Sequence, residues 1–337
     1  MDQLANALLA IIVGVGALLV YYFGTNWILD TALADRMTPQ GVVMTGRSRL
    51  REAIRPWLFV GPAIFLLGLF LVYPAIQTFI LSFFNATSSN FVGLRNYQWA
   101  FNDGEFLQAV GNNILWLLFV PFVSTALGLV IAVLADNVRW GTIAKSLIFM
   151  PMAISFVGAS VIWKFVYDYR GPGATQIGVV NALVTHLGGE PQAWLTIPFW
   201  NNFFLMIILV WIETGFAMVL LAAALRGVPD ETIEAARIDG ASEVAIFFRI
   251  MIPQIMGTIL VVWTTITIVV LKVFDIVLAM TNGQWSTEVL ANLMYDWMFR
   301  GGGDFGRGSM LATILMIGVI PIMVWNIRNF RKEETNR

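Results

Sequence analysis

The sequence predicts an all-α fold, a bundle of helices that crosses a lipid bilayer several times. Of the 337 residues, 58% are hydrophobic and only 12% are charged, whereas a soluble domain averages about 45–50% apolar and about 25% charged residues. The apolar residues gather in long runs separated by short polar stretches. That distribution is typical of a multi-span membrane protein and not of an unusually apolar soluble core.

Seven apolar runs are long enough to cross a bilayer, which takes about 20 residues at a rise of about 1.5 Å each. They cover roughly residues 4–23, 57–84, 114–134, 147–166, 203–225, 255–280 and 310–327. Several exceed the minimum length, which leaves room for tilt or for an extension beyond the lipid. The sequence therefore predicts seven transmembrane helices.

The first run is expected to be a retained helix and not a signal peptide. A signal peptide opens with a positively charged segment, whereas this chain opens with Met1-Asp2-Gln3 and has no Lys or Arg before Arg36. We assign residues 1–56 to an extra N-terminal transmembrane helix and an Arg-rich cytoplasmic linker. The six-span core covers residues 57–330, with a long cytoplasmic loop at 226–253, and a cytoplasmic tail covers residues 331–337.

The basic residues predict the orientation, because cytoplasmic loops carry an excess of Lys and Arg. One set of loops carries fourteen basic residues, namely Arg36, Arg47, Arg49, Arg51, Arg55, Arg139, Lys145, Arg226, Arg237, Arg249, Arg328, Arg331, Lys332 and Arg337. The opposite loops carry only Arg95, Arg170, Arg300 and Arg307. This asymmetry places the first set in the cytoplasm, the N-terminus outside and the C-terminus inside.

Two outer segments have a recognisable character. Residues 168–198 include Gly171-Pro172-Gly173, which favours turns over a continuous helix. Residues 286–300 carry apolar side chains at near-helical spacing, which predicts either an amphipathic helix on or in the outer surface or a helix packed over the mouth of the bundle.

Residues 226–253 are predicted to form a helix, a sharp turn and a second helix on the cytoplasmic side. Pro229 and the acids that follow make a favourable helix start, and Asp239-Gly240 ends that helix because glycine readily takes the left-handed conformation. Ser242 can cap a second short helix over residues 243–251, and Pro253 leads into the next span.

Apolar side chains of this hairpin are available for contact with a partner. The candidates for insertion into a protein groove are Ile233, Ala236, Ala241, Val244 and Phe248. The residues alone leave a second interpretation open, in which the hairpin lies on the inner leaflet as an amphipathic pair.

The same loop carries a spaced motif. Glu234-Ala235-Ala236 is followed after three residues by Gly240 and after nine more by Ile250-Met251-Ile252-Pro253. This pattern resembles the "EAA" signature of ATP-binding-cassette (ABC) importer permeases. Ile252 stands where leucine is usual, which is a conservative departure, and the triplet Asp239-Gly240-Ala241 is also typical of that signature.

The resemblance extends over about residues 57–330 and is strongest to the carbohydrate branch, the maltose and glycerol-phosphate permeases of the first-subunit type. The supporting stretches are residues 91–97, Gly128-Leu129 with Ala132, Phe149-Met150-Pro151 with Trp163, and Phe274-Asp275 before Thr281. The extra first helix and its Arg-rich linker resemble the alpha-glucoside permeases.

The resemblance implies the type I ABC importer permease fold with one additional N-terminal span, located in a bacterial inner membrane. It also implies a second homologous permease, two ATPase subunits, an extracytoplasmic solute-binding protein and a sugar substrate, which in this branch is an alpha-glucoside or other oligosaccharide. No cofactor, metal or catalytic residue is implied, and ATP hydrolysis belongs to the partners. The implied ATPase-coupling residues are Glu234, Ala235, Ala236, Asp239, Gly240, Ala241, Ile250 and Pro253.

A few polar side chains fall inside or beside the apolar runs. Glu213, Lys272 and Asp275 are costly in lipid, by about 2.5–3.5 kcal/mol each on insertion scales, so they should face the bundle interior or water. Lys272 and Asp275 are three apart and would share a helical face, and Glu213 is another candidate partner for Lys272. With Asn113 they form the candidate substrate or gating set; a structural lock or a contact with the partner permease is the alternative interpretation.

Several function classes are disfavoured. The chain has no cysteine and one histidine, His186, so thiolate sites and multi-histidine metal sites are excluded. It contains no Gly-Lys pair and hence no phosphate-binding P-loop of its own. The alternatives that remain open are an ion-coupled secondary transporter or channel, whose intramembrane charges would form the ion path, and a scaffold that only anchors an ATPase.

Overall fold

The computed structural model describes residues 2–34, 45–136, 138–171, 173–300 and 303–335. Arg36, Pro172 and Arg337 lie outside the described residues, and the structure does not describe the side chains of Arg47, Arg331 and Lys332. Helices are the only regular secondary structure of the described residues, which contain no strand and only an isolated β-bridge between Phe84 and Phe91. The predicted all-α class is therefore confirmed. The chain divides into two compact units, Met1–Gln77 and Thr78–Arg337, which are described separately.

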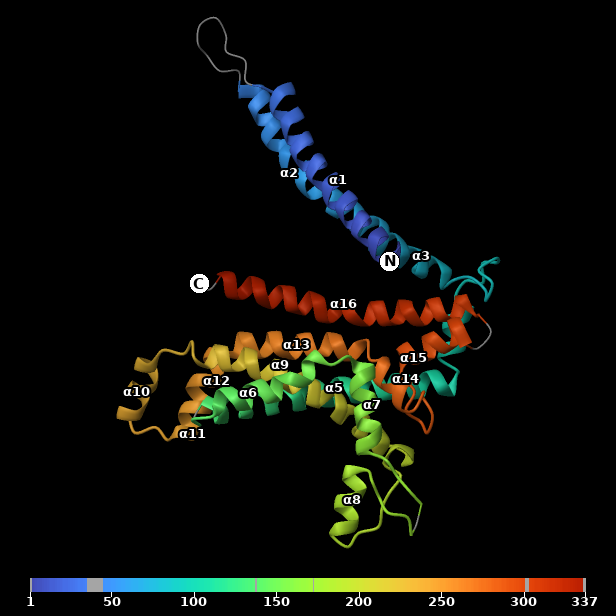
Figure 1. Cartoon of the computed structure of the whole chain (residues 1–337), viewed down its shortest axis with the longest axis vertical. Helices are drawn as coiled ribbons and strands as arrows, with labels where there is room; N and C mark the ends of the chain where they lie inside the picture. Colours follow the sequence, from blue (N-terminus) through green and yellow to red (C-terminus); the bar gives the residue numbers. More distant parts are fainter. Residues whose placement is uncertain (1, 35–44, 137, 172, 301–302, 336–337) are drawn as a thin grey trace, which may run out of the picture. The chain divides into compact units, whose positions relative to one another are not determined.

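The first unit is a helical hairpin. Helix α1 (Asp2–Ala32) lies beside α2 (Thr45–Leu67), which continues through a π-helical turn η1 (Gly68–Val72) into α3 (Tyr73–Leu81). Figure 1 shows α1 and α2 side by side. Helix α2 runs without a break through residues 56 and 57, where the sequence predicts the start of the six-span core.

Polar contacts join the two helices of this hairpin. The phenol groups of Tyr21 and Tyr22 donate hydrogen bonds to the backbone carbonyls of residues 58 and 59, at 3.1 and 3.0 Å. At the other end, Arg55 Nη2 lies 2.5 Å from Asp30 Oδ1. The remaining surface of α1 is apolar and exposed, as suits a helix surrounded by lipid.

The second unit is built around three long helices. They are α5 (Gly104–Asp136), α9 (Trp200–Leu225) and α13 (Met256–Leu271), which pack on one another and supply most of the buried apolar core. The close approach of α5 to α9 requires Gly128, because a Cβ at this position would lie 2.5 Å from the Cβ of Ala217. The long C-terminal helix α16 (Phe305–Thr335) packs against α13.

Two spans are broken, which the apolar runs alone do not reveal. Helix α6 (Gly141–Phe149) passes through a 3₁₀ turn, η2 (Met150–Ala153), and α7 (Phe156–Val166) then leaves at 108°. Two local features produce this break: Pro151 starts the 3₁₀ turn, and Ser155 caps α7 by accepting a hydrogen bond from the backbone N–H of Gly158 at 3.1 Å. The run at residues 147–166 is therefore two helices and not one.

The run at residues 255–280 is also interrupted. Helix α13 ends at Leu271, and α14 (Asp275–Met280) starts only after a short non-helical stretch. In all, five described helices are long and apolar enough to span a membrane, or seven if each sharply bent pair is one span. This range includes the seven predicted spans.

The outer segments are compact. Residues 168–198 contain α8 (Val179–His186) and a 3₁₀ turn, η3 (Trp194–Thr196), arranged around the buried amide of Asn181. After α14, a loop leads to α15 (Leu290–Tyr295) and a π-helical turn, η5 (Asp296–Arg300). The first four residues of α15 are buried against neighbouring helices, so this segment follows the second interpretation, a helix packed over the bundle.

Candidate functional site: a helical hairpin and two broken spans

The predicted hairpin is present at one end of the second unit. Helix α10 (Asp230–Ile238) begins after Pro229 with two acidic residues in its first turn. It ends at Asp239, and Gly240 takes a left-handed backbone with φ of +81°. The N–H groups of Gly240 and Ala241 donate to the carbonyls of residues 237 and 236, both at 3.0 Å. This pair of bonds is the Schellman motif, so the role that the sequence assigns to Gly240 is confirmed.

The second arm of the hairpin starts at Ser242, whose hydroxyl accepts a hydrogen bond from the N–H of Ala245 at 3.3 Å. Arg237 donates two bonds across the turn to the carboxylate of Glu243, at 2.8 and 3.2 Å. These bonds hold the pKa of Glu243 below its usual value and raise that of Arg237. Both side chains are exposed, so the pair orients the turn more than it stabilises it.

The second arm is not the single helix predicted for residues 243–251. It consists of one α-turn, α11 (Glu243–Ile246), a π-helical turn η4 (Phe247–Met251), and a short α12 (Ile252–Gln254). The widening falls just before Pro253, whose ring lacks an N–H and clashes with the carbonyl of the residue four positions earlier. The π-turn brings Ile252 N–H to the carbonyl of Phe247 instead.

The structure divides the predicted contact residues into two groups. Val244 and Phe248 are exposed, and the fraction of each side chain in contact with solvent is 68% and 61%. Ala236 is buried, Ile233 packs against the core of the bundle and Ala241 is half-buried, so these three expose less apolar surface to a partner than Val244 and Phe248.

Ile238 was missed by sequence reasoning although its side chain is 86% exposed. It is the last residue of α10, directly before the turn, so helical periodicity does not single it out. An apolar residue next to a C-terminal glycine turn was the available signal. Ile238, Val244 and Phe248 are hereafter called the apolar tip of the hairpin.

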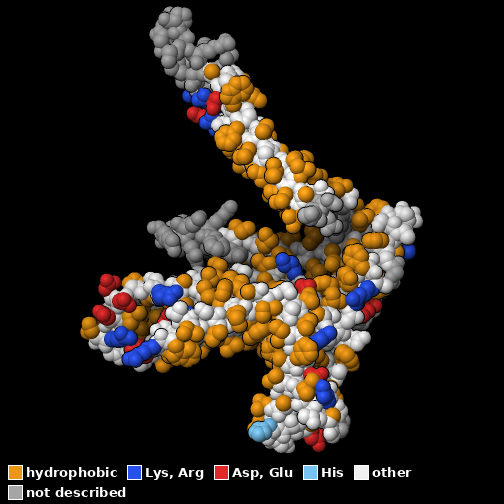
Figure 2. Space-filling view, viewed as in Figure 1, with side chains coloured by type: hydrophobic (Ala, Val, Ile, Leu, Met, Phe, Trp, Pro, Cys, Tyr) orange, Lys and Arg blue, Asp and Glu red, His pale blue; other side chains and the backbone are white. Residues whose placement is uncertain are grey.

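The other predicted coupling residues occupy defined places. Glu234 and Ala235 are exposed on α10, and Asp239 is its C-terminal cap. Ile250 is half-buried in η4, and Pro253 is exposed at the start of α12. Figure 2 shows that charged side chains gather around this end of the molecule, whereas hydrophobic side chains dominate the bundle beside it.

The hairpin is anchored directly in the bundle. Val228, just before α10, and Ile255, just after α12, are both buried in the main apolar core together with Leu225 at the end of α9. Only residues 226–229 separate α9 from α10, and Ile255 alone separates α12 from α13, so the connections to both spans are short.

The three charged residues of the spans do not pair with one another. Glu213 is buried on α9 and its carboxyl makes no hydrogen bond or ion pair within the described part of the chain. The predicted Lys272–Asp275 pair is absent there too. The physical reason is the break in the span: Lys272 ends α13 and Asp275 begins α14, so they do not share one helical face.

The two breaks face each other. Helices α7 and α14 pack together, and an open hollow of about 360 Å³ lies where they meet. It is lined by Met152, Ile154, Ser155, Phe156, Val157 and Asp275. Lys272 and Asp275 also border a much smaller adjoining hollow. Non-helical backbone at membrane depth is tolerated where it is buried or lines a water-filled cavity, so this is the candidate path.

Asn113 lies elsewhere. Its Oδ1 accepts a hydrogen bond from the N–H of Leu290 at 2.8 Å, so it caps the start of α15 at the outer end of α5. Its neighbour Asn112 donates to the carbonyls of Ser286 and Glu288. The structure therefore separates Asn113 from Lys272 and Asp275, with which the sequence groups it.

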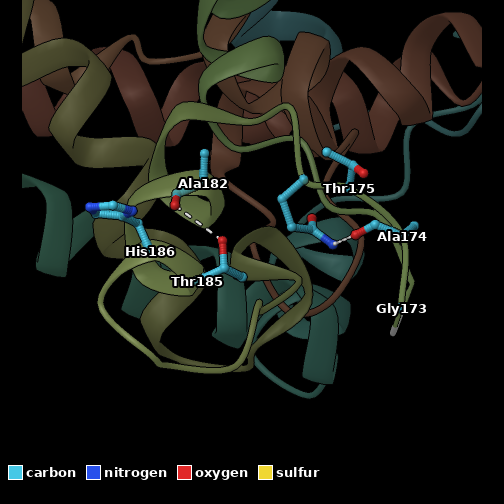
Figure 3. Close-up of a pocket in the computed structure, with 7 residues that line it drawn as sticks. Gly173, Ala174, Thr175, Ala182, Thr185 and His186 are labelled. Atoms are coloured by element: carbon cyan, nitrogen blue, oxygen red, sulfur yellow. Dashed lines mark hydrogen bonds between the residues drawn. The ribbon is translucent and has the colours of Figure 1, made fainter.

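A further hollow, of about 540 Å³, lies in the outer segment around α8 (Figure 3). It is open, and two of its polar side chains already have partners within the loop. Thr185 Oγ1 donates to the carbonyls of Asn181 and Ala182, and Gln176 Nε2 donates to that of Ala174. His186, also on its rim, is the only histidine of the chain. Nothing in this hollow converges on a ligand.

Broken spans around a hollow, together with an exposed helical hairpin anchored in the same core, define a multi-pass membrane transport subunit. The chain belongs to the family of binding-protein-dependent transport system inner membrane components, whose family model matches residues 124–326. It is thus an ABC permease of the inner membrane and neither an enzyme nor an ion-coupled transporter.

Individual relatives agree with this assignment. The chain is 62% identical over 333 residues to an alpha-glucoside transport system permease protein of Rhizobium meliloti, covering 99% of both chains. It is 55% identical over 280 residues to an osmoprotective compounds uptake permease protein of Synechocystis, covering 83% of this chain and all of the relative. The fold matches a bacterial ABC transporter involved in alginate import with a TM-score of 0.71 at 21% identity, covering 84% of this chain and 99% of the other. The predicted permease fold is confirmed.

Proposed function

We propose that the chain forms half of the translocation path for an alpha-glucoside or a related oligosaccharide in an ABC importer. The observation that carries the proposal is the 62% identity to an alpha-glucoside permease over nearly the whole chain, the first helix included. In this proposal an extracytoplasmic solute-binding protein delivers the sugar, a second homologous permease completes the path, and two separate ATPase subunits drive it.

The hairpin is the proposed docking site for the ATPase. Its apolar tip is exposed, whereas Ala236 and Ile246 in the same two arms are buried, and an exposed apolar tip suits insertion of a short helix into a groove of a partner. The short connections to α9 and α13 then allow the geometry of the ATPase dimer to bias the spans. Glu234 and Gly240 contribute an exposed charge and the sharp turn, respectively.

The proposed orientation places this hairpin in the cytoplasm. The Arg and Lys asymmetry along the chain supports this side. Within the second unit, the far end of α16 lies on the same side of the bundle as α10 and α11, whereas α14 and α15 lie at the opposite end (Figure 1). A cytoplasmic C-terminus and an outer position for residues 281–300 follow, and the N-terminus is placed outside by the same charge rule.

For the path itself, the proposed contributors are Lys272, Asp275 and Glu213. The first two border the hollows between the broken spans, and Glu213 is a buried carboxyl on the neighbouring helix α9. Neutral sugars are bound through hydrogen bonds, which carboxylate and ammonium groups in a hollow can supply.

The test is reconstitution of the complete importer in proteoliposomes with a radiolabelled alpha-glucoside. We expect uptake that requires the binding protein, both permeases, and ATP on the side of the membrane that carries the ATPase subunits. Uptake by this chain alone on an ion gradient would contradict the ABC mechanism. ATP-dependent uptake of an osmoprotective compound without uptake of alpha-glucosides would keep the mechanism and reassign the substrate.

A further inference from the structure

The loop between α14 and α15 has an unusual backbone. Asn282, Gly283, Trp285 and Ser286 all have positive φ, between 53° and 76°. Three of these are not glycine, and such residues rarely adopt this conformation unless the surrounding structure holds them there. Contacts that hold the loop in this backbone conformation should therefore be present.

Asparagine side chains from two core helices supply those contacts. Asn112 on α5 donates to the backbone carbonyls of Ser286 and Glu288, at 2.9 and 2.8 Å. Asn201 on α9 donates to the carbonyl of Trp285 at 2.7 Å. The loop thus ties the outer ends of α5 and α9 together. We call the loop residues 281–288 and these asparagines the outer clasp.

Glu288 lies at the centre of the clasp. Its side chain is 4% exposed, and its carboxylate accepts bonds from the N–H of Val289 at 3.0 Å and from Nδ2 of Asn292 at 2.9 and 3.1 Å. A Cβ on Gly283 would lie 1.9 Å from Glu288 Oε2. The carboxyl of Glu288 therefore occupies the space that any side chain at residue 283 would need, so its position in the clasp requires glycine there.

The charges around Glu288 do not favour its ionised form. Burial raises the pKa of Glu288 to about 7; the bonds from Asn292 and Val289 oppose this shift, and the nearby carboxylates of Asp296 and Glu105 add to it. The cation beside them, Arg300, lies 3.6 Å from Asp296 and bonds Asn282 of the loop.

Two further groups complete the surroundings. Arg307 on α16, which packs against α15, pairs at 3.4 Å with Asp304, the residue directly before that helix. Asn292 Oδ1 is buried without a partner in the described structure. If the side-chain amide of Asn292 flips by 180°, this oxygen can accept a hydrogen bond from the O–H of a protonated Glu288.

We propose that Glu288 is the positioning residue of the outer clasp, and that loss of its proton loosens the hold of the clasp on the outer end of α14. The connection to α14 is direct: Asn282 N–H bonds the carbonyl of Val277 at 2.8 Å, and the hydroxyls of Thr281 and Thr287 lie 2.6 Å apart. The opposite end of α14 is Asp275, which borders the hollow. The clasp thereby positions one wall of the path; this last step rests on the proposed function.

The direction of the pH effect follows from the proton balance. The closed clasp binds the proton of Glu288 more tightly than the open loop, in which a carboxyl titrates near its ordinary value. Stability of the clasp is therefore lost as the pH rises toward about 7 and stays low above it. Between pH 6 and pH 8 the clasp should open roughly ten times more often.

Hydrogen–deuterium exchange of the assembled complex in nanodiscs tests this directly. After correction for the intrinsic exchange rate, amides of residues 281–292 in the native protein should exchange about tenfold faster at pH 8 than at pH 6. Glu288→Gln, which cannot ionise, should bring that ratio within about twofold. The matched control is Glu190→Gln, an exposed outer glutamate that should leave the ratio at its native value.

Two results would overturn the proposal. One is an equal corrected exchange rate at pH 6 and pH 8 in the native protein, a measurement that needs no variant. The other is a native ratio in Glu288→Gln. A double-mutant cycle is an independent test. Gly283→Ala should raise the exchange rate of residues 281–292 less in a Glu288→Ala background than in the native protein, because the carboxyl that would collide with the new Cβ is absent. Since exchange needs no substrate, a failure of the sugar assignment would leave these outcomes unchanged.

Discussion

At the scale of single residues, the hairpin shows how local chemistry exposes apolar side chains at the proposed docking site. Gly240 permits a turn that a residue with a Cβ resists, and the turn lets one short segment present apolar side chains at its tip. These residues do little for the stability of the bundle, because they are exposed. Their substitution should therefore affect the partner more than the fold.

Gly240→Pro should leave the permease inserted and folded but abolish ATP-driven uptake. Proline cannot reach a φ of +81° and has no N–H for the 3.0 Å bond to the carbonyl of Arg237. Uptake and ATPase activity of the reconstituted complex measure the effect. The control is Gly171→Ala in the outer segment, where a Cβ meets nothing within 4 Å and activity should be unchanged. Normal coupling in Gly240→Pro would argue against the turn as a transmission element.

Ile238→Ser should weaken the association with the ATPase subunits by about tenfold, which corresponds to about 1.4 kcal/mol for one anchor in a groove. Co-purification or direct titration of the ATPase measures this. Ile177→Ser is a matched control, because that side chain is also exposed, at 56%, but lies in the outer segment. Equal effects of the two variants would contradict a specific role for the apolar tip.

At the scale of helices, the contact between α5 and α9 is the structural centre of the bundle. Its closeness depends on small residues, as is common in membrane bundles, where helices associate by packing and not by the hydrophobic effect. The breaks after α6 and α13 depend on a different kind of signal, a proline, a serine cap and irregular backbone at Lys272–Phe274.

Two alanine substitutions on the same helix should separate packing from helix propensity. Gly128→Ala forces a Cβ to within 2.5 Å of Ala217 and should destabilise the bundle by about 1–3 kcal/mol. Gly111→Ala, where a Cβ meets nothing within 4 Å, should be neutral or stabilise by up to about 1 kcal/mol. Thermal unfolding in nanodiscs measures both, and equal stabilities would show that α5 and α9 can separate at little cost.

At the scale of the whole molecule, the second unit carries one distinctive segment at each end of its bundle. The hairpin lies at one end, as the proposed docking site for the ATPase, and the outer clasp bonds α14 at the other. Between them lies the hollow bordered by Asp275. A transporter with alternating access needs such linked ends, because each must bias the same spans.

Neutralising Lys272 and Asp275 tests whether these charges beside the hollow act independently or as an ion pair. Because no ion pair joins Lys272 to Asp275 in the described structure, the losses of uptake from Lys272→Met and Asp275→Asn should multiply in the double variant. A paired lock would instead let the second change restore part of the loss from the first. Initial uptake rates over a range of sugar concentrations distinguish the two cases, with assembly checked by size-exclusion chromatography.

Much of this protein is readable from its sequence. Long apolar runs predict the spans because the bilayer demands a fixed length of apolar helix, and Asp239-Gly240 predicts the turn because few residues tolerate a left-handed backbone. The spacing of Glu234, Gly240 and Pro253 identified the permease family, which comparison with known proteins confirmed. These are local properties, so the chain displays them without any knowledge of its neighbours.

Only the tertiary structure decided which charges meet and which side chains face outward. Lys272 and Asp275 are three apart in the chain, yet a break in the backbone separates their helices, and Asn113 bonds Leu290 far along the chain. Ile238 is exposed while Ala236 in the same helix is buried. Such outcomes depend on contacts between segments distant in sequence, and apolar spacing within a single segment carries no information about its partner. The sequence by itself determined the family and the sharp turn at Gly240; the packing decided the hollow beside Asp275 and the clasp around Glu288.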